Sequence, residues 1–296
     1  MQRRDLVDLV LLAALWGASF LFIRIAAPAF GPVALVEVRL VSGALVLLPL
    51  LAAGIGLPAL RTHARRIALI SVINFAVPFV LTSYAMLTLT AAFASMLNGT
   101  VPMWTALIGA LWFGERVRPS QWLGLAIGAL GVVVLVGDKV GLDPRGAGWT
   151  ETIAVCAALL GMIFYGLSAN VSKRTLGGVP PLATAAGSQI GAAILLAPLA
   201  VATWPAQAPS AGAWAAVLVL GVLCTGFAHL LYFRLIERVG AMRTANVTYL
   251  IPLFATLWGT LFLAEPLTLR MVVGGAIVLA GTALALGVLD RLRPRR

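Results

Sequence analysis

The sequence predicts an all-α membrane protein in which ten transmembrane helices form two inverted five-helix repeats. Three observations lead to this fold class: an apolar composition, ten apolar blocks of spanning length, and a segment that occurs twice with its loop charges changed. Hydrophobic residues make up 61% of the 296 residues, charged residues make up 10%, and the mean hydropathy is +1.03. Ordinary soluble domains are far less apolar.

Ten apolar blocks account for almost the whole chain. They cover about 6–27, 33–53, 67–87, 91–113, 121–137, 152–172, 182–202, 213–233, 244–263 and 271–289. Each is close to the ~20 residues that a helix needs to span a bilayer. The first block is too long, and too poor in a cleavage-like ending, for a removable signal peptide. Short connections leave no room for an extramembrane catalytic domain.

The longest polar stretch, 138–151, separates five blocks from the next five. We therefore expect a first repeat at 1–137, a periplasmic linker at 138–151 and a second repeat at 152–296. An odd number of spans in each half forces the two halves to face opposite ways across the membrane.

The repeat is clearest where residues 102–137 realign on 252–287 at a constant shift of 150. The shift pairs Pro102 with Pro252, Gly109 with Gly259, Glu115 with Glu265, Gly124 with Gly274, Gly131 with Gly281 and Gly137 with Gly287. The two arginines after the first glutamate, at 116 and 118, become proline and threonine in the second copy. Positive residues stay on the cytoplasmic side of a membrane, so this change predicts opposite orientations for the two copies. Inverted repeats of this kind are typical of secondary transporters.

The net charge of +11 orients the protein and does not indicate a nucleic-acid partner. With the N-terminus inside, the inner loops hold sixteen of the 21 lysines and arginines, and the outer loops hold three. Arg24 and Arg39 lie within spans. This distribution predicts that both termini are cytoplasmic and that anionic membrane lipid is a partner.

The chain lacks the patterns of an enzyme, a metal site or a pump driven by ATP. Cys156 and Cys224 both fall inside expected spans, where we expect small core residues, and they show no disulfide framework and no zinc spacing. There is no HExxH, no pair of mid-span carboxylates and no GxxxxGK[ST] loop. We therefore expect no cofactor and no metal, and a carrier driven by the substrate gradient, by exchange or by a proton. The inverted repeat argues against a channel, which would be expected to show a selectivity ring of charges or carbonyls.

A stripe of small and polar residues marks two spans that correspond in the repeat. Polar side chains within spans are retained mainly where they face protein or a wet cavity. The stripe in the fourth span holds Ala91, Ala94, Ser95, Asn98, Pro102, Thr105 and Gly109, and in the ninth Ala241, Thr244, Ala245, Thr248, Pro252, Ala255 and Gly259. A cavity wall fits this pattern, and close helix packing is the alternative. Each proline frees a backbone carbonyl and forms either a hinge or a polar contact point.

Other spans supply the remaining candidate substrate-binding residues. They are Trp16, Ser19, Ser71, Asn74, Tyr165, Ser168, Gln189, Thr225 and His229. Trp16 and Tyr165 occupy matched positions and either clamp a planar or cationic substrate or pack in the core. His229 is the only histidine within a span; it could carry a proton, although a buried neutral histidine is the commoner outcome.

The few charges within spans and at their ends are candidate structural or gating residues. Arg39 either binds an anionic substrate group or caps backbone carbonyls at a kink, and we favour the second. Glu37 is on the opposite face of its helix from Arg39 but at a depth similar to Arg24, which predicts an Arg24–Glu37 pair between helices. Glu115 and Glu265 end their helices, where we expect a structural role at the membrane surface.

Glycines 124, 128 and 131 form a ridge that 274 and 281 partly repeat. Such a ridge predicts a packing seam, either within the bundle or between protomers. A monomer and a homodimer therefore both remain open.

Three segments of the chain resemble a known superfamily. WGASFLFIRIAAP, followed by Arg39, resembles the opening of drug/metabolite transporters, and segments 92–136 and 246–286 resemble the EamA-type domain of that superfamily. The resemblance implies a transporter of the inner (plasma) membrane with a central substrate cavity and alternating access. It implies a small organic metabolite as substrate, such as an amino acid or a similar amphiphilic solute, with efflux as the expected direction. Because the superfamily also includes lipid-intermediate flippases, a flippase is the alternative.

Overall fold

The computed structural model describes residues 2–55, 57–137, 139, 141 and 148–286. Most of the expected linker, including Arg145, and the last ten residues of the chain lie outside this part. The described residues form helices and connecting loops without any strand.

In chain order the elements are α1 (Arg3–Leu50), the π-helical η1 (Leu51–Ile55), α2 (Leu57–Thr62), α3 (Ala64–Ile70), π-helical η2 (Ser71–Ala76), α4 (Val77–Ala85), α5 (Ala91–Asn98), α6 (Val101–Phe113), α7 (Pro119–Val136), α8 (Gly148–Thr175), α9 (Pro181–Ala202), α10 (Ala211–Gly221), π-helical η3 (Val222–Phe227), α11 (Ala228–Val239), α12 (Ala241–Thr244), α13 (Val247–Leu263) and α14 (Leu269–Ala285). Six continuous helical stretches among them are long and apolar enough to cross a membrane, and α13 and α14 are shorter apolar helices. The structure is thus that of a helical membrane protein.

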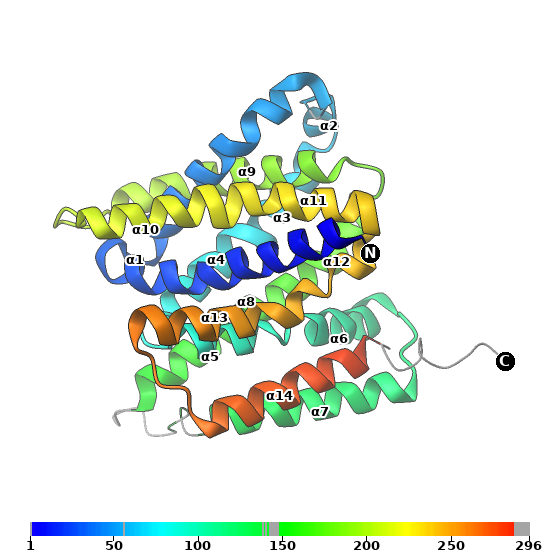
Figure 1. Cartoon of the computed structure of the whole chain (residues 1–296). Helices are drawn as coiled ribbons and strands as arrows, with labels where there is room; N and C mark the ends of the chain where they lie inside the picture. The colour runs from blue at the N-terminus through cyan, green and yellow to red at the C-terminus, as the bar shows by residue number, and fades with distance from the viewer. Residues whose placement is uncertain (1, 56, 138, 140, 142–147, 287–296) are drawn as a thin grey trace.

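The long element α1 consists of two helices that meet at Gly31. This residue has φ 71° and ψ 164°, which is not helical, and prolines at 28 and 32 flank it. Glycine adopts positive φ without the steric cost that a side chain brings. The chain reverses there (Figure 1), so the first two expected spans are joined by a turn with a single non-helical residue.

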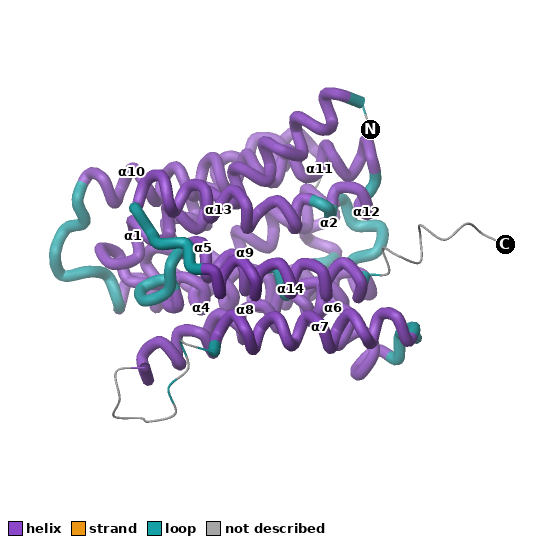
Figure 2. The backbone as a smooth tube through the Cα atoms, turned by 60° about the horizontal axis from the view of Figure 1, so that its bottom comes forward, coloured by secondary structure: helices purple, strands orange, loops and turns teal. Residues whose placement is uncertain are grey.

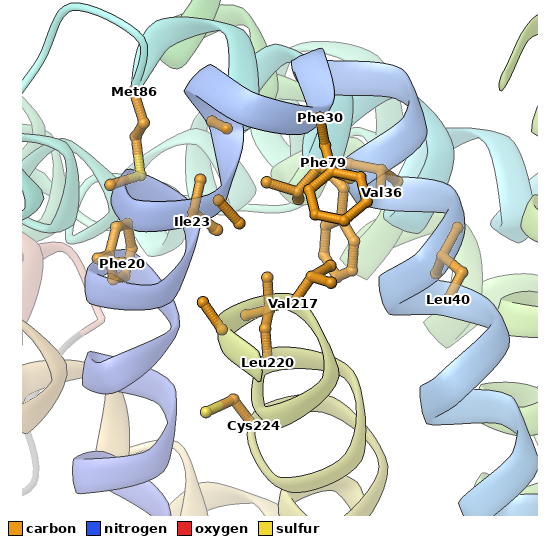
Figure 3. Close-up of a cluster of buried hydrophobic side chains, with 14 of the residues drawn as sticks. Phe20, Ile23, Phe30, Val36, Leu40, Phe79, Met86, Val217, Leu220 and Cys224 are labelled. Atoms are coloured by element: carbon orange, nitrogen blue, oxygen red, sulfur yellow. The ribbon is translucent and has the colours of Figure 1, made fainter. Parts of the chain in front are cut away.

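The largest buried core forms where the two helices of α1 enclose α10. In Figure 3, Val217 and Leu220 of α10 point between Ile23 on the first helix of α1 and Leu40 on the second. All four side chains are buried. Lipid is as apolar as these side chains, so their packing stabilises the bundle through close van der Waals contact.

The glycine ridge packs α7 against α14 within one chain. The two helices lie side by side in Figures 1 and 2. A Cβ atom at Gly131 would lie 2.6 Å from the backbone nitrogen of Val278, and one at Gly124 would lie 2.8 Å from the carbonyl oxygen of Gly281. The seam therefore belongs to the bundle, and a protomer interface is not needed to explain it.

The fourth expected span is broken at Gly99 and Thr100, so Pro102 does not lie in the middle of one continuous helix. Helix α5 ends at Asn98, and Pro102 lies in the first turn of α6, where its missing N–H has no helical partner to lose. The carbonyl of Gly99 at the break accepts a hydrogen bond from Thr282 Oγ1 at 3.1 Å. In the second copy Pro252 lies inside α13, after a break between α12 and α13. The two prolines therefore do not play the same structural part.

One expectation about the cysteines is wrong. Cys224 is buried in the core, whereas Cys156 on α8 is exposed. A helix that is apolar all round gives no periodic signal to separate its lipid-facing side from its core-facing side.

Candidate functional site

A buried cation lies where α1, α4 and η3 meet. Only 8% of Arg39 is exposed. Its Nε donates a hydrogen bond to Thr225 Oγ1 at 2.9 Å, and its Cζ lies 3.7 Å from the centroid of the Phe79 ring. Within the described residues Arg39 forms no ion pair and no hydrogen bond to a backbone carbonyl. The expectation that it caps kinked backbone is therefore wrong, because a hydroxyl and an aromatic face hold it instead.

Aromatic rings continue from Arg39 as one connected group, which we call the ring cluster. It consists of Trp16, Phe75, Phe79, Tyr165, His229 and Tyr232. Ring centroids lie 6.5 Å apart for Phe79–Tyr165, 5.4 Å for Phe75–Phe79, 5.9 Å for Phe75–His229, 6.2 Å for Trp16–His229 and 5.3 Å for Trp16–Tyr232. Offset and edge-to-face pairs at such distances are favourable. The rings come from both halves of the sequence.

Two π-helices contribute to this arrangement. Thr225 lies in η3, and Phe75 lies in η2; the two elements are six residues long and fall 151 residues apart in the sequence. A π-helix shifts the rotation of the residues that follow it and is frequent at functional sites. In η3, Thr225 Oγ1 donates a hydrogen bond to Leu220 O, five residues back, at 2.9 Å. That hydroxyl therefore accepts from Arg39 while it donates to the backbone.

His229 is held by the backbone and surrounded by rings. Its Nδ1 lies 2.6 Å from the carbonyl oxygen of Thr225, so Nδ1 is the donor, because a carbonyl can only accept. Trp16, Phe75 and Phe233 are ring neighbours within 6.2 Å. No ion pair of His229 is found among the described residues.

The remaining predicted site residues lie elsewhere or are engaged locally. Ser71 donates to Ile67 O at 2.9 Å and faces Gly191 of α9, as a packing residue does. Thr105 donates to Val101 O at 2.9 Å within α6. The Ser19 hydroxyl donates a weak hydrogen bond to a carbonyl of its own helix. The side chains of Ser168 and Gln189 are buried. Three further candidates are half-buried, namely Asn74, Asn98 and Thr248. In the described chain no ring contact or hydrogen bond connects Asn98, Thr105 or Thr248 to the ring cluster.

Close packing accounts for several small residues of the two stripes, although Ala245 is exposed. Ala91 and Ala94 of α5 share a buried core with Ala255 of α13. A Cβ at Gly259 would lie 3.4 Å from the Cβ of Ala91. Small side chains here let the helices approach closely, as the alternative reading of the stripe predicted.

The expected Arg24–Glu37 pair is wrong. Arg24 Nη1 donates to the carbonyls of Met86 and Leu87 at 2.8 Å each, and its Nε lies 3.6 Å from Glu265 Oε1. The oxygen Oε2 of Glu37 is buried without a hydrogen-bond partner in the described residues. The loop after α4 and the turn after α13 supply the partners of Arg24, and neither lies near it in the sequence.

Glu115 and Glu265 share one local geometry. The residue before each has positive φ, 67° at Gly114 and 50° at Ala264, which closes the preceding helix. Each glutamate N–H then donates to a glycine carbonyl six residues back, at 2.9 and 3.2 Å. These glycines, at 109 and 259, leave room for the carboxylates to fold back. The repeated (G/A)E motif thus encodes a helix ending.

The two glutamates differ in their partners. Glu115 Oε1 lies 2.8 Å from Lys173 Nζ, and the hydrogen bond from this ammonium lowers the pKa of the Glu115 carboxyl. Glu265 is 9% exposed and accepts a hydrogen bond from Ala91 N at 2.8 Å, while burial raises its pKa. The loop holding Glu115 lies at the end of the bundle that carries the N-terminus, and the loop holding Glu265 lies at the other end (Figure 1).

Sequence reasoning missed Phe75 and Phe79. Phenylalanine suits a lipid face as well as a binding site, so residue type alone gave no signal. Their spacing of four places both on one helical face, and that face adjoins the candidate residues Ser71 and Asn74.

The fold is a helical membrane bundle that holds a buried cation beside a ring cluster, and the family match identifies its class as membrane transporters. Within that class the chain belongs to the EamA-like transporter family, whose model matches residues 7–137 and 152–287. The resemblance seen in the sequence is thereby confirmed.

Relatives extend over nearly the whole chain. An uncharacterized inner membrane transporter of Escherichia coli K12, YedA, is 28% identical over 92% of this chain and 88% of its own length. The uncharacterized transporter YvbV of Bacillus subtilis is 25% identical over 96% and 92%. A crystal structure of another protein, 22% identical, covers 99% of this chain and 100% of its own with a TM-score of 0.69, so the two share a fold.

Proposed function

We propose that this protein is a secondary transporter that carries a small organic solute across the inner membrane by alternating access. The observation that carries the proposal is the buried Arg39 beside the ring cluster, whose rings are buried or half-buried and come from both halves of the chain. In repeat-built carriers the substrate lies between the repeats, and rocking of one against the other opens the site to alternate sides.

The proposed topology has ten passes, with 1–137 and 152–296 as inverted halves joined by a periplasmic linker. Three features support it: the shared geometry at Glu115 and Glu265, the location of these two loops at opposite ends of the bundle, and the matched π-helices. Both termini are proposed to be cytoplasmic, because the loops at the N-terminal end hold most of the positive charge.

We further propose that transport follows the gradient of the solute, in the efflux direction, without a coupled proton. His229 donates its Nδ1–H to a carbonyl and lies among aromatic rings, and it contacts no carboxylate in the described residues. Proton-driven carriers usually need an ionisable group at the site that changes its protonation between states.

The test is flux into proteoliposomes. We expect saturable counterflow of a substrate found in a thermal-shift panel of metabolites, with no accumulation above equilibrium when a pH gradient is imposed at zero membrane potential. Accumulation severalfold above equilibrium that His229→Gln abolishes, with counterflow retained, would refute the uncoupled mechanism. Linear, non-saturable flux would indicate a channel.

The topology has its own test. Single cysteines replace exposed Arg116 and Leu267 in a background where Cys156 and Cys224 are replaced by alanine. In intact cells a membrane-impermeant maleimide is expected to label position 267 and not position 116. Labelling of both from one side would contradict the inverted arrangement.

A further inference from the structure

We propose that Arg39 binds the carboxylate of the transported solute, which makes the substrate class small organic monoanions with an apolar or planar part. This inference deepens the proposed function and rests on it. The structure supplies three observations: how Arg39 is held, which of its donors remain, and what surrounds it.

Arg39 is fixed on two sides. Its Nε is bonded to Thr225 Oγ1, which in turn donates to Leu220 O, and the Phe79 ring lies under the guanidinium plane. The chain Leu220–Thr225–Arg39 therefore sets the orientation of the planar group. Thr225 is a positioning residue, because it acts on the solute only through Arg39.

The opposite edge of the guanidinium has no partner among the residues that the structure describes. Nη1 and Nη2 donate no hydrogen bond to any described residue, and no described carboxylate forms an ion pair with Arg39. A buried charge is retained within a membrane mainly where it pairs with an opposite charge or with backbone carbonyls, or where it marks a substrate pathway. Arg39 has neither of the first two partners among the described residues, so the substrate pathway remains and points to a ligand.

The chemistry of this edge selects a carboxylate. Guanidinium presents parallel N–H groups that match the two oxygens of a carboxylate, a geometry that an ammonium cannot reproduce. Arg39 is the only cation in contact with the ring cluster among the described residues, so it balances one negative charge and not the two of a phosphate monoester. The adjacent ring of Tyr165 is half-buried and offers a surface for an apolar or planar part of the same molecule.

The test measures binding to purified protein with three probes of one shape and different charge. Isothermal titration with 3-phenylpropanoate, 3-phenylpropanamide and 3-phenylpropylamine is carried out at neutral pH and equal ionic strength. We expect the carboxylate to bind at least about tenfold more tightly than the amide or the amine. No binding of 3-phenylpropanoate, or equal affinity for the amide, would overturn the proposal without any mutant.

Variants then locate the anion site. Arg39→Met removes the charge and keeps an unbranched apolar side chain, which suits a membrane span, and it is expected to weaken 3-phenylpropanoate binding about 10- to 100-fold. Arg39→Lys keeps the positive charge but lacks the parallel N–H groups of the guanidinium, and it should give an intermediate affinity. Arg234→Gln removes a positive charge from the exposed face of α11 and serves as the matched control, with unchanged affinity expected. A carboxylate preference that survives in Arg39→Met would refute the assignment.

Counterflow of labelled 3-phenylpropanoate separates this inference from the proposed function. Binding that depends on Arg39 but is not accompanied by counterflow would support the anion site and refute transport. Counterflow of the amine or the amide without preference for the carboxylate would support transport and refute the anion site.

Discussion

Replacement of Gly124 by leucine is expected to prevent the protein from reaching a stable folded state. A Cβ at this position would lie 2.8 Å from Gly281 O and 2.8 Å from the carbonyl carbon of Leu284, both backbone atoms of α14. Backbone atoms cannot rotate away as a side chain does, so α7 and α14 would have to separate. The loss in free energy of unfolding is expected to exceed the value of about 1–3 kcal/mol that is typical of overpacking.

The matched control introduces the same side chain on the other face of the same helix. Ala126 lies two residues along α7 and is exposed, so Ala126→Leu is expected to leave folding unchanged. Both variants are compared by size-exclusion profile and thermal unfolding in detergent. A wild-type profile and melting temperature for Gly124→Leu would show that the seam is not closely packed in the membrane.

Glu265→Leu is expected to destabilise the protein by about 1.5–3 kcal/mol, the range for hydrogen bonds to a charged group. The substitution removes the acceptor of the Ala91 N–H and the carboxylate beside Arg24. Because Glu265 is almost fully buried, water cannot easily replace these contacts. The first turn of α5 and the end of the first helix of α1 would lose their shared contact.

Glu115→Leu is the matched comparison, since it occupies the same place in the first repeat. Its carboxylate is more exposed, with a side-chain exposure of 38%, and its partners are Lys173 and Arg174 at the surface. Exposed ion pairs contribute about 0–1 kcal/mol, so a small shift in melting temperature is expected. Equal losses of stability in the two variants would show that the burial of Glu265 does not matter.

The sequence alone predicted much of the fold because membrane constraints act on composition and spacing. The helical membrane class follows from the apolar blocks, and the close approach of α7 and α14 follows from the spaced glycines. The family came from the resemblance of particular segments to the EamA-type domain. The (G/A)E motif located both helix endings, although their positive-φ geometry became visible only in the structure. Expectations failed where residue type was ambiguous, as at Cys156 and at the two phenylalanines of the third span.

What only the tertiary structure decided is which side chains meet. Helical periodicity fixes the face on which Arg24, Arg39 or Trp16 lies, but it does not fix the rotation of that face relative to helices from distant parts of the chain. Arg24 therefore contacts Glu265 instead of Glu37, and Arg39 contacts Thr225 and Phe79 instead of backbone carbonyls. A turn of one residue at Gly31 and a π-helix before His229 each change those rotations, and neither has a reliable signal in the sequence. The sequence by itself determined that the chain builds a membrane bundle from a repeat. Packing between distant helices determined the ring cluster and left one edge of Arg39 without a partner in the described part of the chain.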